Sequence, residues 1–111
     1  MTHYTSYDLI EWAKPFEKRK NPLPKPKGSE VLIRVTAAGL CHSDLHVQKG
    51  YMDLGKEGRL TFAERGAELP MTFGHEIAGV VENTGADANS FKKGQQVLVF
   101  PWIGCGECPA C

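Results

Sequence analysis

The sequence predicts a mainly β domain, built as a small, irregular barrel with short helices, and three observations support this fold class. Its 111 residues include 12 glycines and 7 prolines, a content that favours many turns and short strands. Short alternating or apolar segments recur at 30–37, 75–82 and 95–100. No stretch shows a long apolar pattern at helical spacing. A chain of this length is enough for one domain with a modest core.

The first predicted strand is Glu30–Ala37, in which alternate apolar side chains fall on one face. Gly39 interrupts this pattern. A short helical turn is expected after it at His42–Gln48, with Ser43 or Asp44 near its start. The apolar face of the strand comprises Val31, Ile33, Val35 and Ala37.

Two further strands are predicted later in the chain. His75–Glu82 ends at the turn-forming sequence Asn83-Thr84-Gly85, and Gln95–Phe100 is the third strand. Tyr51–Leu69 mixes charges and glycines without a clear period, so we expect a long loop there. Lys14–Lys27 mixes basic residues with four prolines, which predicts a solvated, extended segment.

Charge and hydropathy argue against nucleic acid and membranes as partners. The formal net charge is zero at pH 7, so the chain has no general attraction for a polyanion. No apolar run approaches the ~20 residues of a membrane span. Residues 1–12 lack the basic start and apolar stretch of a secretory signal, so a cytoplasmic location is expected. Because no G-x-G-x-x-G run follows a strand, a dinucleotide-binding unit is not expected in this chain.

Three cysteines crowd into the last seven residues as C-x2-C-x2-C. Two-residue gaps allow neighbouring thiolates to face one ion, and four cysteines in a reducing compartment are better metal ligands than disulfide partners. A structural zinc site completed by a further ligand is one interpretation. An iron–sulfur cluster and a redox pair, Cys105 with Cys108, are the alternatives. The cluster comprises Cys105, Cys108 and Cys111.

A second group of chemically active residues lies upstream in two short runs. The first, Gly39-Leu-Cys-His-Ser-Asp-Leu-His46, contains a thiol, two imidazoles, a hydroxyl and a carboxylate. The second begins Gly74-His-Glu and continues to Gly85 as G-H-E-x-x-G-x5-G. A lone cysteine or histidine is most often a packed or satisfied side chain rather than a ligand. The two runs together favour a shared functional site.

These motifs and their order give the chain its resemblance to a known family. From about Glu30 onward it resembles the N-terminal, chaperonin-10-like catalytic domain of zinc-dependent medium-chain alcohol dehydrogenases. The resemblance implies a chaperonin-10-like β-barrel, here truncated. It also implies that residues 1–111 are an incomplete N-terminal catalytic domain without the nucleotide-binding domain.

The resemblance implies two zinc sites. Cys41 and His75 would bind a catalytic zinc, and Glu76 would be an alternate partner. Neighbouring residues of a strand point to opposite faces, so His75 and Glu76 are not expected to aim easily at one ion. Asp44 would accept a hydrogen bond from the far nitrogen of His75. The structural zinc would be held by Cys105, Cys108 and Cys111.

Other roles follow from the same resemblance. Ser43 and His46 would relay the alcohol proton to solvent, which suits a hydroxyl followed by an imidazole. His42 would lie near the pyrophosphate of the cofactor, and Trp102 would line the substrate pocket.

The implied function is oxidation of small alcohols to aldehydes or ketones with NAD or NADP, in a complete parent that is a homo-oligomer. Catalytic zinc would ease removal of the alcohol proton before hydride leaves. The isolated 111-residue chain is expected to show no turnover. The alternatives are a stand-alone zinc-binding module and a zinc-free structural barrel without turnover.

Overall fold

The computed structural model describes residues 2–111 and confirms the mainly β fold class. One short α-helix and one 3-10 turn accompany the strands in the described part of the chain. The elements are β1 (His3–Leu9), β2 (Glu17–Pro22), β3 (Val31–Gly39), α1 (His42–Lys49), β4 (Tyr51–Asp53), η1 (Gly55–Glu57), β5 (Arg59–Thr61), β6 (Met71–Thr72), β7 (Glu76–Thr84) and β8 (Gln96–Val99).

The chain folds as two compact units. The first comprises the chain up to Lys25 together with Leu40–Gly74, and it holds α1 and the sheets β2–β1–β6 and β4–β5. The second comprises Pro26–Gly39 and His75–Cys111, and it holds the sheet β3–β7–β8. Among residues 2–111, no helix has the length and apolar character needed to cross a membrane.

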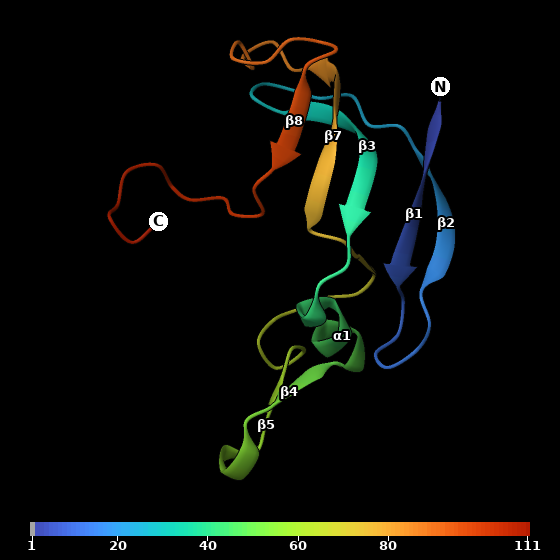
Figure 1. Ribbon diagram of the computed structural model, residues 1–111, viewed down its shortest axis with the longest axis vertical. Helices are drawn as coiled ribbons and strands as arrows, with labels where there is room; N and C mark the ends of the chain where they lie inside the picture. Colours follow the sequence, from blue (N-terminus) through green and yellow to red (C-terminus); the bar gives the residue numbers. More distant parts are fainter. Residues whose placement is uncertain (1) are drawn as a thin grey trace. The chain divides into compact units, whose positions relative to one another are not determined.

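In the first unit, β1 lies beside β2 (Figure 1) and pairs antiparallel with it. On its other edge, β1 pairs antiparallel with β6. The sequence did not predict β1, because two of its three buried side chains, Ser6 and Asp8, are polar and only Leu9 is apolar. Asn21 donates to the Ser6 hydroxyl at 2.7 Å, and the Thr72 hydroxyl donates to the Asp8 carboxylate at 2.7 Å. Because these polar side chains have hydrogen-bond partners, they can be buried at positions where apolar residues would normally reveal a strand.

The segment Lys14–Lys27 is extended and largely exposed, as predicted, but part of it is a strand. β2 lies within it and pairs with β1 over six residues. Its sequence, Glu-Lys-Arg-Lys-Asn-Pro, has no apolar residue before the final proline, so no buried face was visible in the pattern.

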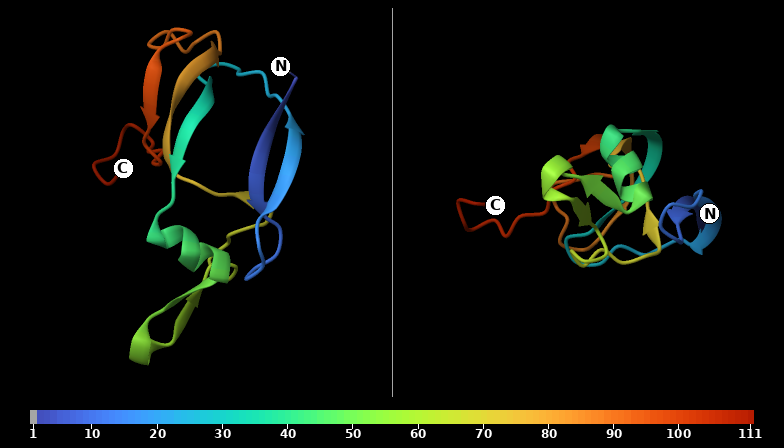
Figure 2. Two further views of the ribbon diagram at one scale, coloured as in Figure 1. Left: turned by 45° about the vertical axis from the view of Figure 1, so that its right-hand side comes forward. Right: turned by 90° about the horizontal axis from the view of Figure 1, so that it is seen from below.

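The predicted helical turn is confirmed as α1, which runs one residue further than expected and leads into the β4–β5 hairpin (Figure 2). This hairpin corrects the expectation of a structureless loop at Tyr51–Leu69. The Arg59 guanidinium carbon lies 4.2 Å from the centroid of the Tyr51 ring, and Lys49 Nζ lies 5.1 Å from it. Such cation–π contacts stabilise strands of three residues, which are too short to show a period.

In the second unit, β7 is the central strand between β3 and β8 (Figure 1). The three predicted strands are confirmed, but the single apolar face expected for β3 is wrong: Val35 is 54% exposed. The register shifts between Leu32 and Ile33 and between Val35 and Ala37. The first shift skips Glu82 on β7 and the second skips Thr36 on β3, so the pairing of the two strands is irregular.

Candidate metal sites

Helix α1 begins at a cysteine. Cys41 is the N-cap residue, with extended backbone (φ −122°, ψ 162°). The backbone N–H of Ser43 donates to the Cys41 thiol at 3.4 Å, and the Cys41 N–H donates to the Asp44 carboxylate at 3.0 Å. Cys41 and Asp44 thus form a capping box, which fixes the direction of the chain as it enters the helix. The thiol is therefore held at a helix N-terminus, where N–H groups favour negative charge.

The remaining polar side chains of this run lie along the first turns of α1. The Ser43 hydroxyl lies 2.8 Å from the Cys41 sulfur. The rings of His42 and His46, one turn apart, meet edge-on with centroids 4.6 Å apart. Ser43 and His46 are three residues apart and therefore lie on neighbouring positions of the helix surface. Their action as a proton relay stays a prediction, as does the placement of His42 near a cofactor.

Strands β3 and β7 bring together the ends of the two motif-bearing runs. Gly39, the last residue of β3, pairs with Glu76, the first residue of β7. Cys41 follows Gly39 by two residues, and His75 immediately precedes Glu76. Both runs therefore leave this strand pair at the same end, although 33 residues separate their ligand candidates.

His75 and Glu76 are closer than strand geometry alone suggested. A ring nitrogen of His75 and a carboxylate oxygen of Glu76 lie within 4.8 Å of each other. The pleat sends neighbours to opposite faces only inside a strand, and His75 lies just before β7 begins. The Glu76 carboxylate lies over the backbone of Gly39, so closely that a Cβ at position 39 would collide with it. Glycine is required there for this placement.

The two later glycines of the G-H-E-x-x-G-x5-G run have a packing role. A Cβ at Gly79 would lie 2.5 Å from the Ile33 side chain and 2.6 Å from the Arg34 carbonyl oxygen. A Cβ at Gly85 would collide with the carbonyl oxygen of Gly28. Both glycines allow close backbone approach, and so they preserve the β3–β7 register that positions the motif ends.

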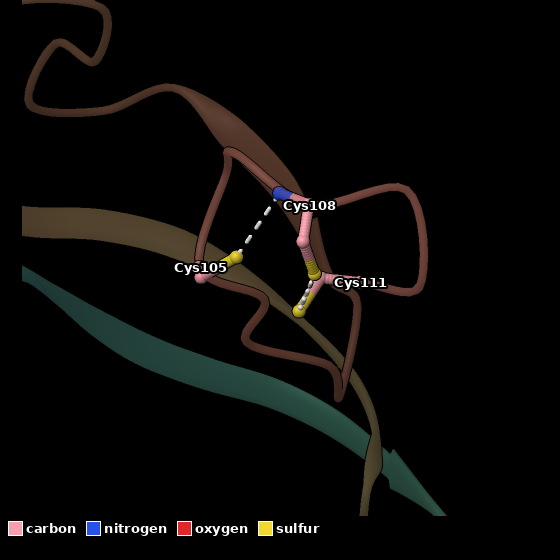
Figure 3. Close-up of side chains that lie close together, drawn as sticks. All are labelled: Cys105, Cys108 and Cys111. Carbon is pink, nitrogen blue, oxygen red and sulfur yellow. Dashed lines mark hydrogen bonds between the residues drawn. The ribbon is translucent and has the colours of Figure 1, made fainter.

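The three late cysteines converge in an exposed loop (Figure 3). Their sulfur atoms all lie within 4.8 Å of one another. With Zn–S bonds of about 2.3 Å, tetrahedral geometry requires sulfurs about 3.8 Å apart, so a small adjustment would fit the ion. The cluster Cys105, Cys108 and Cys111 therefore has the donor type and spacing for zinc.

Hydrogen bonds make the three thiols unequal. The backbone N–H groups of Glu107 and Cys108 donate to the Cys105 sulfur at 3.4 and 3.3 Å. They lower the pKa of Cys105 from 9.0 to about 6, because both stabilise the thiolate. For Cys111, the Cys105 backbone lowers the pKa, but the neighbouring Cys108 and Cys105 thiols outweigh it and raise the pKa above 9.0.

Two contacts missed by sequence reasoning hold Cys111 in this loop. The Trp102 indole N–H donates to the Cys111 carbonyl at 3.2 Å. A Cβ at Gly104 would lie 2.8 Å from the Cys111 Cβ, so a glycine at this position lets Cys111 lie close to the backbone. Gly106 has the left-handed φ of 80° expected of a turn. Trp102 is 62% exposed, and its role in a substrate pocket stays a prediction.

Comparison with known proteins agrees with this arrangement. Residues 27–111 match the sequence model of the alcohol dehydrogenase GroES-like domain. The chain belongs to this family of GroES-like domains found in alcohol dehydrogenases. Its fold is that of the family, which confirms the chaperonin-10-like fold class.

Individual relatives show how far this similarity extends. It is 46% identical to the NAD-dependent alcohol dehydrogenase of Sulfurisphaera tokodaii over 104 residues, which cover 93% of this chain and 28% of that protein. The alcohol dehydrogenase zinc-binding domain protein of Burkholderia ambifaria superposes with a TM-score of 0.75 at 34% identity, covering 96% of this chain and 25% of that one. The D-arabinose dehydrogenase of Sulfolobus solfataricus superposes with a TM-score of 0.75 at 33% identity, covering 100% and 29%. The chain thus spans little more than a quarter of the length of these relatives.

Proposed function

We propose that this chain is the zinc-binding, alcohol-contacting N-terminal domain of an NAD- or NADP-dependent alcohol dehydrogenase. The observation that carries the proposal is the β3–β7 register, which sets Gly39 beside Glu76 and so brings both motif-bearing runs to one end of a sheet. Membership of the family and the NAD-dependent relatives support the reaction class. Turnover, a cytoplasmic location and homo-oligomeric assembly are proposed for a complete dehydrogenase that includes this domain.

The catalytic ion would be held where β3 ends and β7 begins. Cys41 and His75 would supply a thiolate and an imidazole, with the Glu76 carboxylate as an alternate partner; these are the donor types that zinc prefers. The short distance between the His75 and Glu76 ligand atoms, within 4.8 Å, supports this set. When bound, zinc would act as a Lewis acid that makes the alcohol proton easier to remove.

The residues of α1 would move that proton. Ser43 is exposed and lies beside Cys41, so its hydroxyl would accept the alcohol proton while passing its own to His46. His46 would then pass the proton to solvent. His42 would approach the cofactor pyrophosphate.

Two further groups would act around the reacting atoms. Asp44 already orients the backbone of Cys41, and it would also hold the imidazole of His75 in one tautomer. Trp102 would form part of the wall of the alcohol pocket.

The cysteine cluster would bind a second, structural zinc. Its three sulfurs supply three of the four ligands of a closed tetrahedral site, and the fourth would come from outside the cluster. Its role would be to fix the shape of an otherwise irregular loop.

Metal analysis of matched variants tests the two sites. We expect the zinc-loaded chain to hold one ion at each site. Cys41→Ser should remove one ion and leave the cysteine cluster filled, whereas Cys108→Ser should do the reverse. Zinc content by elemental mass spectrometry, with the cobalt absorption of each site, gives the readout. Unchanged metal content in both Cys41→Ser and His75→Gln would refute the catalytic site.

The metal content and one further variant, Ser43→Ala, separate the alternative functions. A stand-alone zinc-binding module would bind both ions, but Ser43→Ala in a complete dehydrogenase carrying this domain would leave turnover unchanged. A zinc-free structural barrel would hold neither ion. The proposed dehydrogenase requires both the ions and the Ser43 hydroxyl.

A further inference from the structure

The cysteine cluster supports a chemistry besides metal binding. We propose that Cys108 and Cys111 form a redox-active dithiol, a site at which a peroxide converts two thiols into a disulfide whenever no metal ion holds them. This inference needs neither an alcohol nor a nicotinamide cofactor. It therefore stands apart from the proposed dehydrogenase activity.

The pairing of the thiols identifies which two would react. The Cys108 thiol donates a hydrogen bond to the Cys111 sulfur, with the two sulfurs 3.1 Å apart (Figure 3). The Cys105 sulfur interacts mainly with the backbone N–H groups of Glu107 and Cys108, and less strongly with the other two thiols. A disulfide bond is about 2.05 Å long, so the contacting pair needs to approach by only about 1 Å. This pairing differs from Cys105 with Cys108, the redox pair considered from the sequence, although the two pairs have the same spacing.

Contacts on the far side of the loop hold Cys111 in reach of Cys108. The Trp102 indole N–H binds the Cys111 carbonyl at 3.2 Å, and Gly104 lets the chain pass close to the Cys111 Cβ. Only Pro109 and Ala110 separate the two thiols in sequence. Closing so short a loop costs little additional entropy, because most of the ordering is already present.

The pair is also accessible to a small oxidant. Every residue from Pro101 to Cys111 is exposed, and the described chain has no helix or strand after Val99. Exposure and thiolate character decide which cysteines oxidise, and buried cysteines are generally inert. Cys108 and Cys111 are both exposed, so a small oxidant can reach them.

The reaction with hydrogen peroxide balances in two steps. One thiolate attacks a peroxide oxygen, so that an S–O bond forms, the O–O bond breaks and a water is released after proton uptake. The second thiol attacks the resulting sulfenic sulfur, so that the S–S bond forms, the S–O bond breaks and a second water leaves. Two thiols lose two electrons and two protons, and one peroxide becomes two waters.

The oxidised pair and a bound metal exclude each other. A metal ligand must be a thiolate, and neither sulfur of a disulfide carries that charge. The cluster would therefore exist either as a metal site or as a disulfide with Cys105 left over. A thiol reductant would restore metal binding.

Glu107 makes the test direct, because it lies between Cys105 and Cys108. The metal-free chain is treated with hydrogen peroxide, alkylated and cut with a glutamate-specific protease before mass spectrometry. We expect the peptide that begins at Cys108 to be lighter by two hydrogen atoms and to carry no alkyl group. Cys105 should be alkylated on a separate peptide. A disulfide that joins Cys105 to either other cysteine, or oxidation without any disulfide, would overturn the proposal.

Matched variants and a metal-loaded sample complete the experiment. Cys105→Ser should retain the disulfide, Cys111→Ser should lose it, and both lie in an exposed loop where folding is spared. Gly104→Ala should slow its formation, because the added methyl displaces Cys111. Zinc-saturated chain should be protected, and equal oxidation rates with and without zinc would refute the exclusion. If zinc fails to bind the cluster but the disulfide forms, the structural-zinc proposal fails while the dithiol stands.

Discussion

The two cysteine-bearing regions of this chain are organised in opposite ways. Cys41 is half-buried, is the N-cap residue of α1, and follows β3, a strand that pairs with β7 far along the chain. The late cluster is exposed and lies within seven residues of irregular loop. The first depends on long-range strand pairing, and the second depends on local turns and on contacts among its own thiols. The proposed site at Cys41 therefore requires the folded sheet, whereas the late cluster needs only its own loop.

The largest expected effect comes from removing a ligand of the local cluster. Structural zinc sites contribute about 10–16 kcal/mol over four ligands, so loss of Cys108 should cost about 3 kcal/mol, or about 100-fold in zinc affinity. Cys108→Ala should weaken zinc binding at the cluster by this amount and leave the site near Cys41 unchanged. Competition titration against a chromophoric chelator measures both. A simultaneous loss at both sites would show that the two regions are not independent.

A substitution in the sheet should weaken metal binding near Cys41 and leave the cysteine cluster unaffected. Gly79→Ala places a methyl group against Ile33 and the Arg34 carbonyl, and overpacking of this kind costs about 1–3 kcal/mol. We expect a lower midpoint in urea unfolding and weaker metal binding near Cys41, with the late cluster unaffected.

Gly55→Ala is the matched control for this change. Gly55 has a φ of 68° but no atom within 4 Å of its added methyl, so only backbone strain of about 1 kcal/mol is expected. Equal unfolding midpoints for the two variants would show that close approach at Gly79 is not the cause.

Removal of the capping carboxylate should have a smaller effect. Asp44→Ala deletes the acceptor for the Cys41 N–H, and the loss of a cap costs about 1 kcal/mol. Metal affinity near Cys41 should fall about tenfold, as for other residues that orient a ligand. Asp44→Asn keeps an acceptor oxygen and should recover most of the helix stability measured by circular dichroism. If Asp44→Ala leaves the cobalt spectrum unchanged, the carboxylate does not position the thiol.

The smallest expected effect is a difference in thiol reactivity with pH. Because backbone N–H groups lower the pKa of Cys105 to about 6, its thiolate predominates above that pH and is lost below it. Alkylation of Cys105 in the metal-free chain should therefore accelerate about tenfold between pH 5 and pH 7 and then level off. Quantitative mass spectrometry after cleavage at Glu107 separates it from the other two thiols. A midpoint near 9.0, the ordinary value from which the pKa is lowered, would contradict the assigned hydrogen bonds.

Much of the arrangement was visible in the sequence, and the exceptions have physical causes. The strands β3, β7 and β8 were predicted from apolar segments, and the cysteine cluster from spacing. β1 was missed because Ser6 and Asp8 are buried with hydrogen-bonding partners in place of apolar side chains. The irregular register of β3 and β7 was missed because a bulge leaves no mark in an alternating pattern.

Close contacts between backbones were equally invisible before the fold was known. The G-H-E-x-x-G-x5-G run indicates that its glycines matter, but only the folded structure shows that Gly79 and Gly85 lie directly against neighbouring backbone. The Trp102–Cys111 hydrogen bond joins two residues of one loop and has no sequence signature. Patterns report side-chain chemistry well and report backbone proximity poorly.

The proposed zinc ligand Cys41 is also the N-cap residue of α1, which would tie metal supply to the order of that helix. α1 has eight residues, and helices this short are marginal without outside support. By mass action, an ion present at a hundred times its dissociation constant adds about 2.7 kcal/mol to the folded state, more than the cap itself supplies. The availability of zinc, more than the composition of α1, would then decide in what fraction of molecules the segment between β3 and β4 is helical.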